Sequence, residues 1–143
     1  MKTQTETEPG RTASSTSPVR VLLVDDSPCF LEAAAGLLSG HAELAVVGQA
    51  CSGREAIQMV KSRAPDLVLM DLSMPQMNGL EATRQLKAHA AAPKIIIVTL
   101  HNSLACQVAA REVGADGFVN KSDFADGLLL VIQKLFPSSW VGA

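Results

Sequence analysis

The chain has 143 residues, of which 48% are hydrophobic, and its formal net charge is −2 at pH 7. This length is enough for one domain with a substantial core and too short for two. The small net charge gives no broad basic surface, which disfavours direct binding of nucleic acid. The apolar runs are too short to span a bilayer and no apolar signal segment opens the chain, so we expect a cytoplasmic domain without membrane contact.

Residues 1–18 are dominated by Thr, Ser, Glu, Pro and Gly and almost lack large apolar side chains. They bury too little surface to offset the entropy lost on ordering, so we expect a disordered N-terminal tail. One folded domain is expected over 19–137, with a short C-terminal tail over 138–143. The cysteines show neither a Cys-x-x-Cys pair nor zinc-finger spacing, and we expect reduced, mostly buried thiols at Cys29, Cys51 and Cys106.

Short apolar runs alternate with helical patterns along the rest of the chain. The predicted strands are Val21–Val24, Leu44–Gln49, Leu67–Met70, Lys94–Val98 and Gly117–Val119. The predicted helices are Pro28–Leu38, Gly53–Arg63, Gly79–His89, Ser103–Val113 and Asp123–Phe136. Ser27 and Ser52 are placed to cap the first two helices, and Gly114 to end the fourth. Continuously apolar strands are typical of a parallel sheet covered on both faces, so the pattern predicts a doubly wound α/β domain.

Polar side chains stand at the ends of the predicted strands. Asp25 and Asp26 close the first strand and Asp71 closes the third, while Thr99 ends the fourth and Lys121 follows the fifth. In doubly wound sheets, ligands bind beyond the carboxyl ends of the strands where the strand order reverses. Three carboxylates about 6 Å apart repel by roughly 3 kcal/mol per pair at an effective dielectric near 20, and a divalent cation reverses that sign. The sequence therefore predicts an acidic, cation-binding pocket.

Each of these residues alone has an ordinary structural explanation. Acids after strands often form turns or helix caps, a single Lys is usually a solvated surface charge, and a strand Thr is often satisfied by the backbone. Their joint occurrence at successive strand ends favours a functional site. In the segment after Asp71, Asn78-Gly79 is interpreted as turn chemistry, and Met74 and Met77 as packing within the loop.

Several features, in order along the chain, resemble the receiver domain of a two-component response regulator. They are the acid pair Asp25-Asp26, the stretch Asp-x-x-Met-Pro-x-x-x-Gly that begins at Asp71, the strand-end Thr99, and Lys121. The resemblance covers about Val19 to Phe136 and implies a flavodoxin-like (βα)5 fold, with a parallel sheet of order 2-1-3-4-5 and helices on both faces. The residues Gly117-Phe118 and Lys121-Ser122 resemble those of receivers usually joined to a helix-turn-helix output domain.

By that resemblance Asp71 is the phosphoacceptor, which takes a phosphoryl group from a sensor histidine kinase. The domain is then a switch rather than an enzyme. The cofactor implied is Mg²⁺, a hard cation that prefers oxygen ligands. The implied metal ligands are Asp25 (through water), Asp26, Asp71 and the backbone carbonyl of Ser73, and the implied phosphoryl-binding residues are Thr99 and Lys121.

The resemblance also implies a switch and residues that set its rate. Thr99 and Phe118 match the family's switch pair, which biases a surface formed by the fourth helix, the fifth strand and the fifth helix. Rate-modulating positions are Ser73, Leu100 and His101. Leu100 stands where the family usually has Ala, Gly or Ser, so we expect slower phosphorylation by small donors or slower loss of the phosphoryl group.

The fifth predicted helix carries apolar residues on more than one face. Leu129, Leu130 and Phe136 lie partly outside the stripe that can face the sheet, which predicts a homodimer or another protein partner through this helix. A broad core contact with scattered exposed leucines explains the same pattern equally well.

Two further alternatives concern the whole chain. No output domain follows the last predicted helix, so the chain is expected to be either a stand-alone receiver or a fragment of a DNA-binding regulator. The alternative function is a small metal-dependent phosphohydrolase that uses Asp71 as its nucleophile. Such enzymes of the haloacid dehalogenase type place a second aspartate two residues later, where this chain has Ser73.

Overall fold

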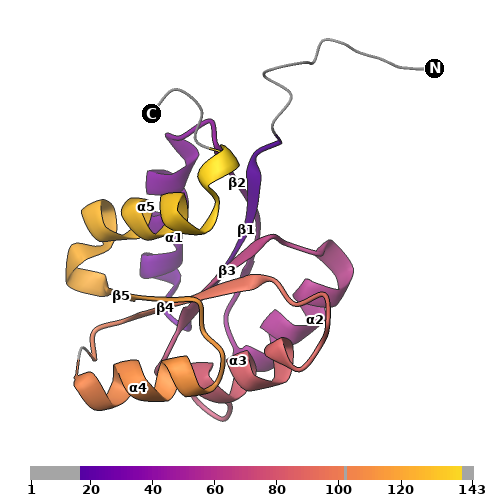
Figure 1. The fold of residues 1–143 in the computed structure, drawn as a ribbon, viewed down its shortest axis with the longest axis vertical. Coiled ribbons are helices and arrows are strands. Elements are labelled where there is room, and N and C mark those ends of the chain that lie inside the picture. The colour runs from indigo at the N-terminus through magenta and orange to yellow at the C-terminus, as the bar shows by residue number, and fades with distance from the viewer. Residues whose placement is uncertain (1–16, 102, 140–143) are drawn as a thin grey trace.

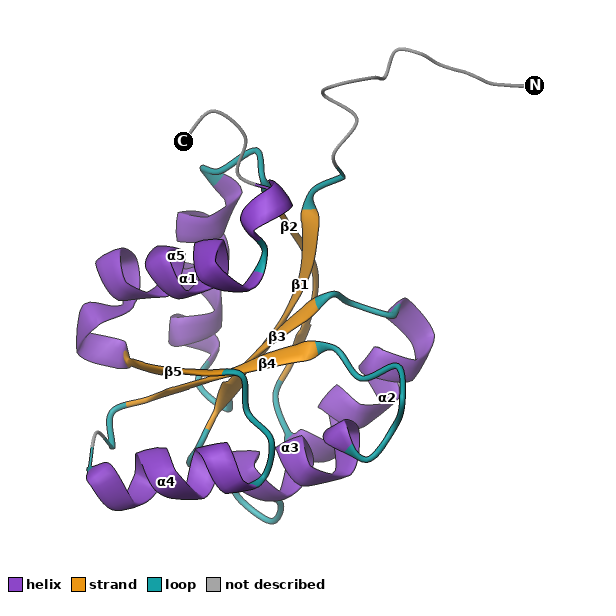
Figure 2. Cartoon of the chain, in the orientation of Figure 1, coloured by secondary structure: helices purple, strands orange, loops and turns teal. Residues whose placement is uncertain are grey.

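The computed structural model of the chain describes residues 17–101 and 103–139. These residues form one parallel sheet with helices on both of its faces (Figures 1 and 2). The strand order is β2-β1-β3-β4-β5, which confirms the predicted doubly wound fold. Most of the predicted N-terminal tail (1–16) and part of the predicted C-terminal tail (140–143) lie outside the described residues.

The predicted elements are all present, with small differences at their ends. The strands are β1 (Val19–Val24), β2 (Leu44–Ala50), β3 (Leu67–Asp71), β4 (Lys94–Thr99) and β5 (Gly117–Asn120). The helices are α1 (Pro28–Ser39), α2 (Gly53–Arg63), α3 (Gly79–Lys87), α4 (Leu104–Glu112) and α5 (Phe124–Leu135), with single 3-10 turns η3 (Lys121–Asp123) and η4 (Pro137–Ser139). Helix α3 ends earlier than predicted because the N–H groups of Ala88 and His89 bond three residues back, which tightens the last turn.

Side-chain caps fix where the first helices begin. The Ser27 hydroxyl oxygen accepts from the N–H of Phe30 at 3.3 Å, with Pro28 in the first turn of α1. The Ser52 hydroxyl oxygen accepts from Glu55 N–H at 3.1 Å at the start of α2. Gly114 follows Val113, the C-cap of α4, and has a φ of +97°, the left-handed conformation that ends helices. These three sequence predictions are confirmed.

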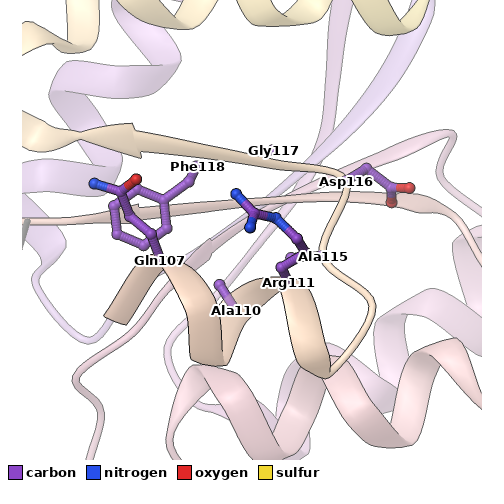
Figure 3. Close-up of a pocket in the computed structure, with 7 residues that line it drawn as sticks. All are labelled: Gln107, Ala110, Arg111, Ala115, Asp116, Gly117 and Phe118. Atoms are coloured by element: carbon purple, nitrogen blue, oxygen red, sulfur yellow. The ribbon is translucent and has the colours of Figure 1, made fainter. Parts of the chain in front are cut away.

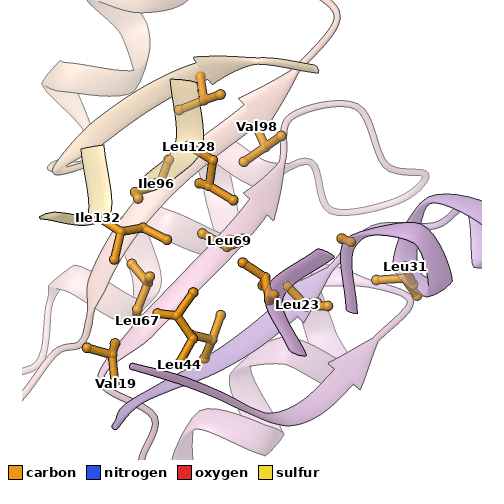
Figure 4. Packing of buried hydrophobic residues seen from close by; sticks show 14 residues of the cluster. Val19, Leu23, Leu31, Leu44, Leu67, Leu69, Ile96, Val98, Leu128 and Ile132 are labelled. Carbon is orange, nitrogen blue, oxygen red and sulfur yellow. The ribbon is translucent and has the colours of Figure 1, made fainter. Parts of the chain in front are cut away.

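Two separate hydrophobic cores cover the faces of the sheet. Leu23, Leu69 and Ile96 point from neighbouring strands toward α1 and α5, where they meet Leu31 and Leu128 (Figure 4). The alternate strand residues, among them Leu22, Val68 and Ile97, pack on the other side against α2, α3 and α4. Strands buried on both faces have little freedom to shift, so the groups at their carboxyl ends are held firmly.

The fifth helix buries more of its surface than one stripe. Leu128 and Ile132 are fully buried, and Leu129 and Phe136 pack partly buried against the same core. Leu130 remains 64% exposed on the opposite side. The broad core contact thus accounts for Leu129 and Phe136, and it leaves Leu130 as an apolar surface residue.

The expectation of mostly buried cysteines is wrong. Cys29 and Cys51 are exposed, Cys106 is half-buried, and all three are free thiols. Cys29 lies in the first turn of α1, and Cys51 follows β2, where its N–H donates to Glu55 at 2.7 Å. Both positions face the rim of the sheet rather than its cores.

Among the described residues, no helix combines the length and the apolar character needed to cross a membrane.

Gly79 brings the start of α3 directly onto the end of β3. Its N–H donates to the Leu72 carbonyl at 2.9 Å, and a Cβ at this position would overlap the backbone carbonyl of Asp71. Asn78 caps the helix by accepting from Glu81 N–H at 2.9 Å. Asn78-Gly79 is therefore structural, as predicted, but it shapes the backbone that carries Asp71.

The close approach at Gly79 predicts the effect of adding one methyl group. Gly79→Ala should lower the free energy of unfolding by about 2 kcal/mol or more, because the rigid strand end must move to admit the Cβ. Gly36→Ala is the matched control, since Gly36 lies exposed in α1 with no atom within 4 Å of an added Cβ. It should stabilise the protein by roughly 0.5 to 1 kcal/mol. Urea denaturation measures both, and equal effects of the two substitutions would contradict the prediction.

Candidate functional site

The carboxyl edge of the sheet gathers the predicted site residues around one cavity. Asp25 and Asp26 follow β1, Asp71 ends β3, Thr99 ends β4, and Lys121 follows β5 directly. The cavity has a volume of about 200 Å³ and is lined by Asp25, Asp26, Ser27, Asp71, Ser73, Thr99, Leu100, His101 and Lys121. All the predicted site residues except Phe118 therefore lie together.

The three carboxylates are held unusually close. Each of Asp25, Asp26 and Asp71 offers an oxygen that lies within 4.8 Å of the others. Asp25 is 1% and Asp71 5% exposed, whereas Asp26 faces solvent. Ionised groups at such a separation repel by about 3 kcal/mol per pair at an effective dielectric near 20. The cluster is stable with all three groups ionised only if cations offset this repulsion.

Asp25 shows that the cluster fits a divalent metal ion. Its Oδ1 accepts from Ser27 N–H at 2.9 Å. Its Oδ2 has no hydrogen-bond partner among the described residues, although Lys121 Nζ lies 2.7 Å away as an ion pair without hydrogen-bond alignment. A buried carboxylate oxygen with open lone pairs, beside two other carboxylates, is the oxygen-only donor set that Mg²⁺ or Ca²⁺ takes.

Asp71 is the group whose ionisation the site perturbs most. Burial raises its pKa from the ordinary value of 3.8 to about 6, and the negative charge of Asp25 acts in the same direction. Lys121, whose Nζ lies 3.5 Å from Asp71 Oδ1, acts in the opposite direction and offsets only part of the rise. The protein's own groups therefore do not fully offset the cost of burying the ionised form of Asp71 beside another carboxylate.

The remaining lining residues differ in how they are held. Thr99 is 1% exposed, and its Oγ1 accepts from the N–H of His101 at 3.1 Å. Leu100 is 70% exposed at the mouth of the cavity, and Ser73 and His101 are also exposed. The inner wall of the cavity is therefore buried, while its entrance is formed by side chains open to solvent.

Phe118 lies outside this cavity, on the α4 side of β5. Its ring points from β5 toward α4 and lies beside Gln107 (Figure 3). Phe118 pairs with Ile97 in the β4–β5 register, and Thr99 stands two residues beyond Ile97 on the same strand. Because side chains alternate along a strand, Thr99 and Phe118 face the same side of the sheet.

Phe30 also contacts the site, although the sequence did not predict it. Its ring centroid lies 4.3 Å from Lys121 Nζ, which places an aromatic face against the charged group of the cavity. Phe30 follows the acid pair by four residues, in the first turn of a helix that begins at the rim. This spacing was the available signal, but it does not reveal which way the ring points.

Comparisons with known proteins agree with this geometry. The family model of the response regulator receiver domain matches residues 21–133. The nitrate/nitrite response regulator protein NarL of Escherichia coli strain K12 is 34% identical over 121 residues, which cover 85% of this chain and 56% of NarL. The transcriptional regulatory protein DegU of Brevibacillus brevis is 30% identical over 115 residues, 80% of this chain and 49% of DegU. The chain spans about half the length of these curated relatives.

A solved structure gives the same result in three dimensions. A two-component response regulator of the LuxR family from Aurantimonas sp. SI85-9A1 matches with a TM-score of 0.80 at 35% identity. The match covers 85% of this chain and 87% of that chain. Sequence and fold therefore point to the same family.

The raised pKa of Asp71 predicts a pH-dependent effect of removing its charge. The folded state holds this proton more tightly than the unfolded state, so stability falls as pH rises from about 4 to 6. Above that window, the ionised group destabilises the metal-free fold by roughly 2 to 3 kcal/mol. Asp71→Asn should therefore be more stable than the wild type by about this amount at pH 7.5, and nearly equal to it at pH 4.

Urea denaturation at the two pH values, with a chelator present, measures this difference. Asp126→Asn is the control, because Asp126 is exposed in the first turn of α5 and lies outside the acidic cluster. A gain from Asp71→Asn that is the same at both pH values would show that the Asp71 charge is not the cause.

Proposed function

Since the chain belongs to the response regulator receiver domain family, we propose that it accepts a phosphoryl group on Asp71 from a sensor histidine kinase. The family is regulatory rather than catalytic. The observation that carries the assignment is the position of Asp71, which is buried at the end of β3 among two other carboxylates and the Lys121 ammonium. The cytoplasmic location expected from the sequence is part of this proposal.

The proposed transfer uses Asp71 as a nucleophile. One carboxylate oxygen bonds to phosphorus while the bond from phosphorus to the kinase's imidazole nitrogen breaks, and the imidazole leaves with the electron pair. The product is an acyl phosphate on Asp71. Phosphoryl transfer needs mainly positioning and neutralisation of charge. Lys121 and the Thr99 hydroxyl are the groups of this chain that can donate to the phosphoryl oxygens.

Mg²⁺ is the proposed cofactor. When bound, it neutralises the clustered carboxylates and the negative charge of the incoming phosphoryl group. The residues that would hold it are Asp26, Asp71 and the backbone carbonyl of Ser73, with Asp25 engaging through water. The buried Asp25 oxygen without a hydrogen-bond partner among the described residues and the oxygen-only donor set support this assignment.

The proposed output is a change in the surface formed by α4, β5 and α5. A phosphoryl group on Asp71 adds charge and acceptor oxygens that draw Thr99 toward it. Phe118 shares a sheet face with Thr99 and lies only partly buried against α4, so space vacated by Thr99 is open to its ring. The shift is limited by the difference in phosphoryl affinity between the two states.

The partners of this surface are also part of the proposal. Leu130 on α5 is an exposed apolar residue suited to a homodimer or another protein partner. Light scattering over a concentration series, with and without beryllofluoride, distinguishes these two. The names of DegU and of the LuxR-family structure support a further proposal, that the domain controls a DNA-binding output in a longer regulator.

The phosphohydrolase alternative receives no support from the comparisons. Ser73 stands where such an enzyme would place its second aspartate, and the matching family is a family of regulators. Release of inorganic phosphate from small phosphate monoesters over many turnovers would restore this alternative.

Formation of the adduct tests the proposed function directly. With Mg²⁺ and acetyl phosphate, the intact mass of the wild type should increase by one phosphoryl group, because Asp71 is the nucleophile. Asp71→Asn should show no increase, and the control Asp126→Asn should match the wild type. A full increase on Asp71→Asn, or no increase on the wild type under any Mg²⁺ concentration, would refute the assignment.

The bulk of Leu100 at the mouth of the cavity is predicted to slow the gain or the loss of the phosphoryl group. Leu100→Ala should speed phosphorylation by acetyl phosphate or loss of the phosphoryl group by about three- to tenfold, because a bulky side chain at the entrance hinders the attacking group. Leu104→Ala is the control, since Leu104 is 75% exposed on α4 and does not line the cavity. Time courses of intact mass give both rates, and unchanged rates in Leu100→Ala would remove Leu100 from the rate-modulating set.

A further inference from the structure

The Lys121 ammonium is enclosed on three sides by groups from two other parts of the chain. Its Nζ lies 2.7 Å from Asp25 Oδ2 and 3.5 Å from Asp71 Oδ1. The third neighbour is the ring of Phe30, whose centroid is 4.3 Å away. This distance is well within the range in which the negative face of an aromatic ring attracts a cation.

The Phe30 ring adds a contact to the Lys121 ammonium, which the two carboxylates alone do not hold in one place. The Lys121 side chain is only 15% exposed, so protein groups form most of its surroundings. It forms one close ion pair, with Asp25 at 2.7 Å, whereas its contact with Asp71 is longer, at 3.5 Å. A Lys side chain also has four rotatable bonds, and holding it in one place is unfavourable in entropy unless neighbours restrict it.

Phe30 is itself held in place by the segment that carries Lys121. Its ring packs edge-to-face on Phe124, with centroids 5.1 Å apart and ring planes at 70°. Phe124 is the first residue of α5 and follows Lys121 by three positions. Both rings pack partly buried against the core under α1 and α5. The aromatic pair therefore joins α1, the helix after the acid pair, to the start of α5, which directly follows the turn that carries Lys121.

We propose that Phe30 is a positioning residue for Lys121, which holds the ammonium beside Asp71 ready for the oxygens of an incoming phosphoryl group. The inference rests on the proposed function, because Phe30 acts only through Lys121. An aromatic face attracts a cation over a broad area, unlike a directional hydrogen bond. Lys121 can therefore move from Asp25 toward phosphoryl oxygens without losing this contact.

The test uses the full chain and two ligands of opposite charge. Fluorine NMR titration with beryllofluoride, at fixed Mg²⁺, measures affinity for a phosphoryl mimic, and calorimetry measures affinity for Mg²⁺ alone. Phe30→Leu should weaken beryllofluoride binding by about three- to tenfold and slow phosphorylation by acetyl phosphate by a similar factor. Mg²⁺ affinity should be equal or slightly higher, because a loosened ammonium repels the metal less.

Three further variants separate the electrostatic role from packing. Phe30→Tyr keeps the aromatic face and should stay within about twofold of the wild type. Pentafluorophenylalanine at position 30 keeps an aromatic shape but reverses the charge of the ring face, so it should behave like Phe30→Leu. Phe136→Leu is the packing control, because Phe136 lies partly buried against the same core without a contact to Lys121, and it should match the wild type.

The outcomes separate this inference from the proposed function. Failure of the wild type to bind beryllofluoride would overturn both. Binding that is lost in Asp71→Asn but unchanged in Phe30→Leu would overturn the role of Phe30 alone. A parallel loss of Mg²⁺ affinity in Phe30→Leu, or wild-type behaviour of the pentafluoro variant, would show that the ring acts through packing and would also overturn it.

Discussion

Repulsion among three carboxylates held at one edge of a rigid sheet is the constraint on which the rest of the site depends. Asp25, Asp26 and Asp71 offer oxygens within 4.8 Å of one another, and the strands that carry them are buried on both faces. The backbone therefore cannot relax the repulsion by moving apart. Two consequences are visible: burial, together with the charge of Asp25, raises the pKa of Asp71 to about 6, and the ammonium of Lys121 lies against the carboxylates from the end of β5. A single ammonium cannot offset three carboxylates, which leaves a place for a divalent cation.

The backbone around Asp71 is built to keep this arrangement rather than to relieve it. Gly79 lets the start of α3 rest on the Asp71 carbonyl, and Asn78 caps that helix. Met74 and Met77 pack against the core on the α3 side, as expected for loop residues. The loop after β3 is thus fixed at both ends. The repulsion between like charges therefore persists in the metal-free fold and lowers its stability. Sites that perturb the pKa of a carboxyl in this way are typical of functional positions.

The sequence was sufficient to predict the parts of the fold and of the site that depend on strand ends and helix caps. Parallel strands carry their carboxyl ends to one edge, so the order of Asp25, Asp71, Thr99 and Lys121 along the chain was enough to predict that they meet. It was insufficient where the answer depended on the direction of a side chain. Phe30 is an example, because its position in the first turn of a helix does not reveal that its ring packs on Phe124 and faces Lys121. The predicted burial of Cys29 and Cys51 was wrong for a related reason, since apolar character alone does not distinguish a position at the rim from one in the core.

On the proposed function, Thr99 and Lys121 differ in how they are prepared to donate to a phosphoryl group. The Thr99 oxygen accepts from the N–H of His101, which leaves its own hydrogen free to donate without breaking that bond. Lys121 is instead paired with Asp25 and must be shared when new acceptor oxygens arrive. On the proposed function, Thr99 therefore moves with its backbone partner attached, and His101 lies in the segment between β4 and α4. We therefore expect a displacement of Thr99 to act on the backbone at His101, and a displacement of Lys121 to act first on the charge balance among the carboxylates.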